Sequence, residues 1–269
     1  MAYPDLVKIA EGREAEIFAW DEGTVLRLMR SPEAKQAVEW QAHALRAARA
    51  AGVSVPEVHG VTEALGRPGL IMERVEGPDM LTLIGRRPWL VFSVGSVSGK
   101  LHAELHGVQA PDDLRALRPA LKASIEASDL VPRHLAQFAL ATLDTLPDGD
   151  RLCHGDFHPG NLIKTDGEPV VIDWSNVTRG DPAADVARTL LMLRIGEPPP
   201  GAPVLVRVLA AFARGILLSA YRRAYRRHRP IDPDLVARWE IPVAAQRLTE
   251  NIEGERPALL RLLEARAAR

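Results

Sequence analysis

Residues 153–185, which read CHGDFHPGNLIKTDGEPVVIDWSNVTRGDPAAD, decide the fold. Asp156 precedes Asn161 by five residues, and twelve further positions lead to Asp173, which ends the apolar run 169–172. An aspartate and an amide on one loop, with a carboxylate at a strand end, supply the oxygen ligands that Mg²⁺ prefers. Phosphoryl transfer needs positioned Mg²⁺ and an orienting base more than covalent chemistry. The spacing therefore predicts a phosphoryl-transfer site on this segment.

The same segment carries a resemblance to a known family. Residues 154–161, HGDFHPGN, resemble the catalytic loop H-x-D-x-x-x-x-N of kinases. They are more similar still to the aminoglycoside phosphotransferase and choline kinase-like family, in which an Ile-Asp-Trp triplet and then Gly-Asp-Pro-x-x-Asp follow, as at residues 172–174 and 180–185 here. Shorter matches come upstream in the family's order, at residues 25–28, 52–56, 71–77 and 105–106. The resemblance covers roughly residues 10–190 and implies an α+β, bilobal protein-kinase-like fold.

The resemblance also implies a role for each matching residue of the loop. Asp156 would accept or orient the proton of the acceptor hydroxyl. Asn161 and Asp173 would hold Mg²⁺ against the phosphates of ATP. Three further residues would support the loop without touching substrate: His154, Asp181 and Asp185. Asp181 would do so as the N-cap of the following helix.

On the nucleotide side, the sequence departs from the family at one pair of positions. Arg27 stands where the family usually has a strand lysine that reaches the phosphates, and Gln41 aligns with that lysine's customary glutamate partner. Glu39 lies two residues from Gln41, about 200° around a helix, and should face away. We therefore expect Arg27 to be held only by a neutral amide.

Two other nucleotide contacts follow from the resemblance. Backbone groups of Glu73 and Val75 would meet the adenine edge, in the hinge between two lobes. Gly12 would cradle phosphate, although residues 12–16 contain one glycine where protein kinases have three.

Outward from this segment, the pattern predicts a small antiparallel sheet with one helix, followed by a larger, mostly helical lobe. Short apolar runs in residues 3–30 are broken by a hairpin turn at 21–23. Ser31 and Pro32 predict a helix start and Gly52 its end, with more strands at 53–61 and 70–75. Helical periodicity marks 90–107, 117–128, 132–145, 182–195, 203–228, 233–250 and 257–267. We expect a nucleotide-binding lobe over residues 1–76 and a catalytic and substrate-binding lobe over 77–269.

Composition excludes several classes of protein. The 269 residues are 46% hydrophobic and 26% charged, which excludes a disordered or fibrous chain. The single cysteine, Cys153, excludes an intrachain disulfide, and we expect it to pack as a small core residue. No apolar run approaches the roughly 20 residues of a membrane helix, and residues 1–14 lack the apolar core of a signal peptide. We expect a cytoplasmic protein with no membrane partner.

Charge is distributed unevenly along the chain. The formal net charge is −1, yet residues 201–269 contain 13 Arg, no Lys and 7 acidic residues. Kinases of polycationic antibiotics need carboxylates in the substrate lobe, so the pattern favours another small acceptor. His158, Glu240 and Glu250 are the candidates to contact it. Between Asp173 and Asp185 there is no room for a segment that docks a peptide.

The sequence therefore predicts an ATP- and Mg²⁺-dependent phosphotransferase that acts on a hydroxyl of a small molecule, with Asp156 as the base. An antibiotic kinase, for aminoglycosides or macrolides, is the alternative within this class. A nucleotide-binding pseudoenzyme is suggested by Gln41 and the single glycine, while the intact Asp156, Asn161 and Asp173 argue against it. The basic run 221–229 suggests nucleic-acid or anionic-lipid binding, but favours the solvated face of a helix. We expect no nucleic-acid partner, and the oligomeric state stays open.

Overall fold

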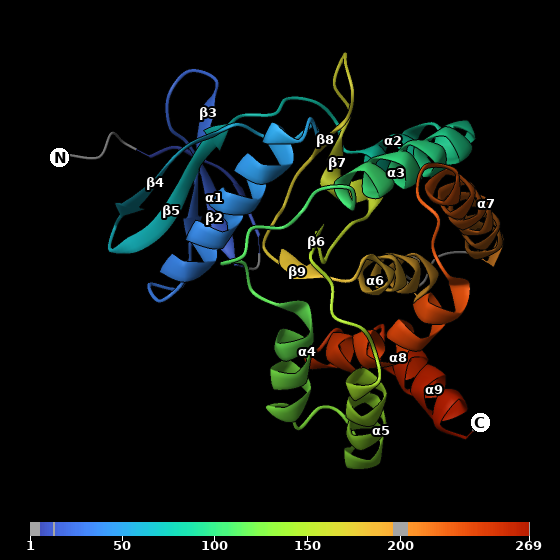
Figure 1. Cartoon of the computed structure of the whole chain (residues 1–269). Coiled ribbons are helices and arrows are strands. Elements are labelled where there is room, and N and C mark those ends of the chain that lie inside the picture. Colours follow the sequence, from blue (N-terminus) through green and yellow to red (C-terminus); the bar gives the residue numbers. More distant parts are fainter. Residues whose placement is uncertain (1–5, 13, 196–203, 269) are drawn as a thin grey trace.

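The computed structural model describes residues 6–12, 14–195 and 204–268, and it is built from a sheet lobe and a helical lobe (Figure 1). Some predicted elements include residues outside the described ones. These are residues 3–5 of the apolar runs in 3–30, residue 13 of the segment 12–16, and residue 203 of the helix 203–228. The sheet is antiparallel with the order β1-β2-β3-β5-β4: β1 (Lys8–Glu11), β2 (Ala15–Ala19), β3 (Thr24–Met29), β5 (Arg67–Glu73) and β4 (Val58–Ala64). The hairpin at residues 21–23 is confirmed, with Gly23 at φ +74° as such a turn requires.

Helix α1 (Lys35–Ala50) packs on the sheet and begins later than predicted. Ser31 does not cap it, because its hydroxyl bonds locally to Glu33 and residues 32–34 form a separate turn. The predicted end is confirmed, since Gly52 follows in the left-handed conformation at φ +84°.

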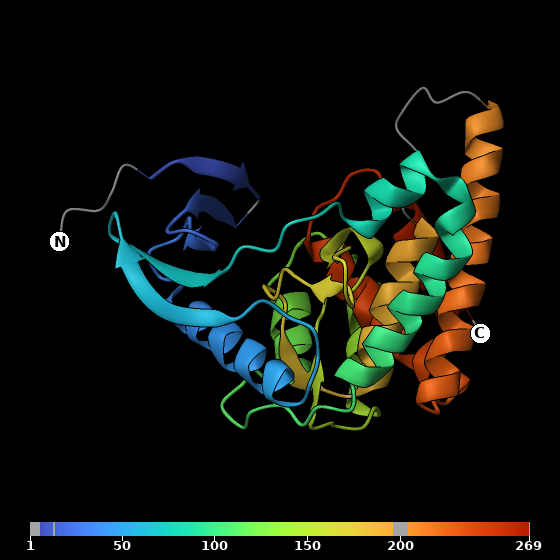
Figure 2. The same ribbon diagram turned by 90° about the horizontal axis from the view of Figure 1, so that it is seen from above.

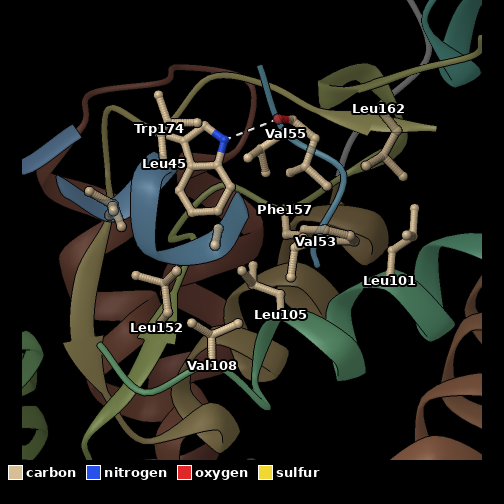
Figure 3. Packing of buried hydrophobic residues seen from close by; sticks show 14 of the residues in the cluster. Leu45, Val53, Val55, Leu101, Leu105, Val108, Leu152, Phe157, Leu162 and Trp174 are labelled. Atoms are coloured by element: carbon tan, nitrogen blue, oxygen red, sulfur yellow. Dashed lines mark hydrogen bonds between the residues drawn. The ribbon is translucent and has the colours of Figure 1, made fainter. Parts of the chain in front are cut away.

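The strand predicted over residues 53–61 was wrong in its first half. Strand β4 begins only at Val58, after Pro56, which cannot donate to a ladder. Instead the Ser54 carbonyl accepts from the Val171 amide at 2.9 Å, and Val53 and Val55 join the core beneath the catalytic loop. Figure 3 shows these valines packed among side chains from both lobes. This segment therefore joins the lobes.

The helical lobe contains each predicted helix to within a few residues, and one more. Its helices are α2 (Met80–Arg86), α3 (Val91–Leu105), α4 (Leu117–Glu126), α5 (Arg133–Asp144), α6 (Pro182–Ile195), α7 (Val204–His228), α8 (Pro233–Thr249) and α9 (Arg256–Ala267). Helix α2 was missed because seven residues are too few to show a periodicity, although Asp79 caps it by accepting from the Thr82 amide at 2.8 Å.

Helices α3 and α7 lie side by side along one edge of the helical lobe (Figures 1 and 2). Two glycines of α3 make this possible. A Cβ at Gly99 would lie 2.3 Å from the Tyr221 carbonyl oxygen, and one at Gly95 would lie 2.7 Å from that of Leu217. The backbones therefore approach more closely than any side chain would allow.

Two short two-stranded antiparallel sheets carry the catalytic segment between the lobes. Strand β6 (Arg151–Cys153) pairs with β9 (Thr178–Gly180), and β7 (Leu162–Ile163) pairs with β8 (Val170–Val171). The chain crosses from the sheet at Gly77, where φ is +140° and a Cβ would lie 2.1 Å from the Lys164 carbonyl oxygen. The lobe boundary between residues 76 and 77 stays a prediction. Among the described residues, none of the helices is long and apolar enough to cross a membrane.

Candidate active site

A cavity of about 1280 Å³ lies between the sheet and the helical lobe. It brings together most of the residues predicted from the sequence: Gly12, Arg27, Gln41, Glu73 and Val75 from the sheet side, and Asp156, His158, Asp173 and Glu250 from the helical side. Ser175, Arg188, Gln246 and Arg247, which the sequence did not single out, line it too.

Asp156 is held by the loop that carries it. The side-chain amide of Asn161 donates to the Asp156 carbonyl at 2.9 Å and to its Oδ2 at 3.2 Å. His158 Nε2 lies 3.6 Å from the same oxygen, while its Nδ1 accepts from the Gly160 amide at 3.0 Å. The five-residue spacing thus folds Asn161 back onto the aspartate and fixes the direction of its carboxylate.

Charge around Asp156 keeps it ionised. Burial alone would raise the pKa of its carboxyl, but the nearby His158 and Arg188 lower the pKa to about 2. Arg188 Nη2 lies 4.0 Å from Asp156 Oδ1. At neutral pH the group is therefore a carboxylate that can accept a hydrogen bond from a hydroxyl.

Asp173 adopts a backbone conformation that is unusual for its residue type. Its φ is +59°, in the left-handed region, and it stands two residues after the end of strand β8. The Ser175 hydroxyl donates to its Oδ1, and Arg27 Nη2 lies 3.5 Å from that oxygen. Strained residues of this kind cluster at functional sites, and the side chain is 44% exposed where it lines the cavity.

Asn161 and Asp173 fit a divalent cation. The Ile172 amide donates to the Asn161 carbonyl at 2.9 Å, which ties the loop to the residue before Asp173. Among the described residues, neither Asn161 Oδ1 nor Asp173 Oδ2 takes part in a hydrogen bond. An amide oxygen and a carboxylate oxygen are hard donors, of the kind that Mg²⁺ binds.

Arg27 reaches across from β3 to the catalytic side. Its Nη1 donates to Gln41 Oε1 at 2.9 Å, so the predicted amide partner is confirmed. The prediction that an amide alone holds it was wrong, because Nη2 donates to Ser175 at 2.9 Å and pairs with Asp173. The loop after β8 supplies these partners, which no sheet pattern could reveal.

The predicted adenine contacts lie at the end of β5. The Glu73 amide already donates to the Glu57 carbonyl at 2.8 Å, so its own carbonyl is the group left for a ligand. Val75 and Gly12 both line the cavity, Gly12 at the turn between β1 and β2.

The backbone of the catalytic loop rests on Asp185, in the first turn of α6. Its two carboxylate oxygens accept from the His154 amide at 2.5 Å and the Gly155 amide at 3.0 Å. His154 is neutral, since burial lowers its pKa, and its Nε2 donates to the Ile172 carbonyl at 3.0 Å. Asp181 accepts from the Ala183 amide at 2.7 Å, as an N-cap does.

His102 of α3 and His106, the residue that follows the end of this helix, complete the network. His102 Nε2 and His106 Nε2 lie 3.1 and 3.2 Å from Asp185 Oδ2. Their Nδ1 atoms lie 2.7 Å from the hydroxyls of Tyr221 and Tyr225, respectively, on α7. Only His106 belonged to the Leu-His pair noted in the sequence. The i, i+4 spacing places His102 on the same helix face and could have revealed it.

The three groups His102, His106 and Asp185 also have the separation of metal ligands, with all ligand atoms within 4.8 Å. Each ring nitrogen nevertheless has a protein partner, and the carboxylate accepts two backbone amides as well. The cluster is therefore satisfied by hydrogen bonds and supports the loop.

An ion-pair network forms the far wall of the cavity. Arg188, one turn after Asp185, donates to Gln246 Oε1 and Glu250 Oε1, both at 2.7 Å. Arg247 pairs with the other oxygen of Glu250 at 2.6 Å and with Glu255 at 2.6 Å. These contacts join α6 to α8 across about 60 residues of sequence. Because a sequence pattern reflects contacts between near neighbours, it could not predict them.

Glu240 is a correction to the predicted substrate contacts. It precedes Glu250 by ten residues of α8, which is about 15 Å along the helix. Glu240 is buried against Arg194 and Arg266, and it lines a second cavity instead of the main one.

The buried histidines predict a loss of stability in acid. Burial, aided by the nearby His106, lowers the pKa of His102 to about 3, although Asp185 opposes the shift. Between pH 6.5 and about 3 the unfolded chain therefore binds a proton at His102 that the native protein does not. In this window, the free energy of unfolding measured with urea should decrease as the pH is lowered, by about 1.4 kcal/mol per pH unit for one proton.

The matched variants for this prediction are His102→Gln and His134→Gln, the latter at an exposed position on α5. The slope of unfolding free energy against pH should flatten in the first variant and stay as in the parent protein in the second. An unchanged slope in His102→Gln would contradict the prediction.

Solved structures of phosphotransferases share this fold. A thermostable mutant of the aminoglycoside phosphotransferase APH(4)-Ia aligns with a TM-score of 0.67 at 19% identity, over 98% of this chain and 94% of that one. The amicoumacin kinase hAmiN aligns with a TM-score of 0.66 at 15% identity, over 98% and 88%. An aminoglycoside-3'-phosphotransferase of type VIII aligns with a TM-score of 0.61 at 21% identity, over 89% of this chain and 93% of that one. A search of curated protein sequences found no match.

The chain therefore has a protein-kinase-like fold, with a cleft between its sheet and its helical lobe. The sequence model of the phosphotransferase enzyme family matches residues 5–231. Because the match covers most of the chain, the protein belongs to this family.

Proposed function

We propose that the protein is a kinase that transfers the γ-phosphate of ATP, with Mg²⁺, to a hydroxyl group of a small molecule. The observation that carries the proposal is the convergence of Asp156, Arg27 and Asp173 on one cavity, with Asn161 hydrogen-bonded to Asp156. Solved relatives of the same fold have been crystallised with ADP and hygromycin B, and with AMP-PNP, Ca²⁺ and amicoumacin. A location in the cytoplasm stays a prediction.

Each residue has a separate task in this proposal. Asn161 and Asp173 hold Mg²⁺, which when bound neutralises phosphate charge and orients the transferred group. Arg27 binds phosphate from the sheet side with its planar fork of donors. Asp156 accepts the hydrogen bond of the acceptor hydroxyl and aims its oxygen at the phosphorus. With a pKa of about 2 it acts by orientation more than as a strong base.

The charges of the far wall support an acceptor that is not a polycation. Glu250 and Glu255 are the carboxylates there, and both are already paired with Arg188 or Arg247. A polycationic ligand needs carboxylates that are free to meet its charges. We therefore propose a neutral or anionic hydroxyl compound as the acceptor.

An ADP-release assay with a panel of acceptors tests this function. Sugars, macrolides and amino alcohols are compared with aminoglycosides at equal concentration. ADP release should be faster with a neutral compound than with any aminoglycoside. Fastest release with an aminoglycoside would favour a dedicated antibiotic kinase. Metal-independent ATP binding, with no ADP release from any acceptor, would favour a pseudoenzyme.

The proposed phosphate contact predicts a large change in nucleotide affinity. Arg27→Ala should weaken binding of Mg·ATP by about 10- to 100-fold, because a charge-assisted hydrogen bond contributes about 1.5–3 kcal/mol. Calorimetric titration measures this. Arg46→Ala, an exposed arginine on α1, is the control and should bind as the parent protein does. Equal affinity in Arg27→Ala would remove Arg27 from the nucleotide site.

A further inference from the structure

A second cavity, of about 260 Å³, lies in the helical lobe between α6, α7, α8 and the end of α9. Four of its lining residues are positively charged: Arg194, Arg222, Arg226 and Arg266. Glu240 is the acidic residue among its lining groups, and it is already paired with Arg194 and Arg266. Four guanidinium groups thus face one carboxylate, and the cavity carries an excess of positive charge.

Two of these arginines are available to a ligand. Arg222 and Arg226 are exposed, and within the part of the chain that the structure describes neither has an ion-pair or hydrogen-bond partner. They stand one helical turn apart on α7, so both point to the same side. Burial, with the charges of Arg222 and Arg266, lowers the pKa of Arg194. The guanidinium groups therefore repel one another, and a bound anion would relieve that repulsion.

The lining residues of this cavity that carry no charge are apolar or aromatic. Val186 and Leu190 of α6 and Val236 of α8 line it, together with the rings of Tyr221 and Tyr225. An apolar wall with a few convergent charged groups is typical of a small-molecule site. The combination suits an anionic group, such as a phosphate or carboxylate, on a small apolar body. Arginine binds such groups with two parallel hydrogen bonds.

The tyrosine wall connects this cavity to the catalytic loop. Tyr221 and Tyr225 lie 2.7 Å from His102 and His106, respectively, and both histidines bond to Asp185. Asp185 in turn holds the amides of His154 and Gly155. A ligand against the tyrosines is thus separated from the catalytic backbone by one chain of buried hydrogen bonds.

We propose that this second cavity is a regulatory site that binds a small organic anion with an apolar body and steadies the catalytic loop through the tyrosine–histidine–aspartate network. The inference does not rest on the phosphotransfer reaction, because the binding and its effect on the loop can be measured without an acceptor.

Phenyl phosphate is the probe, since it joins a dianion to an aromatic ring that the cavity can hold. Calorimetric titration should show binding to the parent protein. In the double variant Arg222→Ala/Arg226→Ala the affinity should fall at least tenfold. The matched control is Arg223→Ala/Arg227→Ala, which removes the same charge from exposed positions of α7 outside the cavity. That control should bind within twofold of the parent protein.

Amide hydrogen exchange provides the second measurement. Saturating phenyl phosphate should slow exchange in a peptide that covers residues 153–157 at least twofold, in the parent protein and in the control but not in the Arg222→Ala/Arg226→Ala variant. Ala237→Phe, which places a ring in the cavity, should also abolish the effect of the probe.

Four results would overturn the proposal. The first is no binding of phenyl phosphate, and the second is an equal loss of affinity in both double variants, which would indicate a general charge effect. The third is binding that leaves exchange in residues 153–157 unchanged. Probe bound in the main cavity would persist in the Arg222→Ala/Arg226→Ala variant and would count against the proposal.

Discussion

Replacing Asp156 by alanine is expected to lower ADP release by about 10²- to 10⁴-fold, because the acceptor hydroxyl would lose the carboxylate that accepts its hydrogen bond and orients it in the transition state. Affinity for Mg·ATP should change less than threefold, because Arg27 on the sheet side and Asp173 on the helical side of the cavity remain in place. The measurement pairs a coupled ADP-release assay with calorimetric titration of nucleotide. Loss of turnover without loss of binding is the signature of a residue that acts on the acceptor.

Asp166→Asn is the matched control for this variant. Asp166 lies in the same segment, between β7 and β8, but it is exposed and does not line the cavity. The control should keep the parent rate. Turnover retained in Asp156→Ala would exclude Asp156 as the group that orients the hydroxyl.

The pKa of Asp156 adds a pH dependence to this prediction. Because the pKa is about 2, the carboxylate loses its charge only as the pH falls through that value. Between pH 5 and 8, the rate of the parent enzyme should therefore show no titration that the Asp156→Ala variant removes. A step in this range that disappears with Asp156 would show that its pKa is higher.

The catalytic segment could be predicted because its chemistry is local. Asp156, Asn161 and Asp173 fall within 18 residues, and the antiparallel pairs β6–β9 and β7–β8 fold that stretch onto itself. Spacing along the chain thus translates directly into spacing in the cleft. The helices were predictable for a similar reason, since their apolar periodicity is set by contacts within a few turns.

The rest of the site depends on contacts between distant segments. Arg188 meets Glu250 across 62 positions, and His102 meets Tyr221 across 119. Nothing local distinguishes Arg188 from any exposed arginine, or Glu250 from Glu240, which lies on the same helix and in another cavity. The charge asymmetry of residues 201–269 did indicate a scarcity of free carboxylates, and the paired glutamates give it a structural basis.

The sequence did not distinguish a strand from a buried connecting segment where the chain joins the two lobes. Val53 and Val55 alternate as in a strand, yet they are buried in the hydrophobic cluster that also contains Phe157 and Trp174 (Figure 3). Alternation indicates which side chains are buried, but it does not indicate which part of the protein they pack against. The helix start predicted at Ser31 was wrong for a related reason, because a serine in a turn and a serine that caps a helix look the same in the sequence.

Removal of the Asp185 carboxylate is expected to have the largest effect on stability. Asp185→Ala would leave four donors without their acceptor: the amides of His154 and Gly155 and the Nε2 atoms of His102 and His106. Each buried donor that loses its partner costs about 1–3 kcal/mol. We therefore expect a loss of roughly 4 kcal/mol or more in the free energy of unfolding, a large share of the 5–15 kcal/mol typical of a domain.

Asp181→Ala separates this effect from simple loss of a helix cap. Asp181 accepts one amide at the start of the same helix, and loss of an N-cap costs about 1 kcal/mol. Tyr225→Phe removes only the hydroxyl next to His106 and should cost about 1 kcal/mol as well. Urea unfolding at pH 7.5 ranks the three variants. If Asp185→Ala lost no more stability than Asp181→Ala, the carboxylate would be a local cap and the catalytic loop would be held by some other contact. If Asp185→Ala were too unstable to fold, losses of only about 1 kcal/mol in Asp181→Ala and in Tyr225→Phe would still locate the large loss at the Asp185 carboxylate.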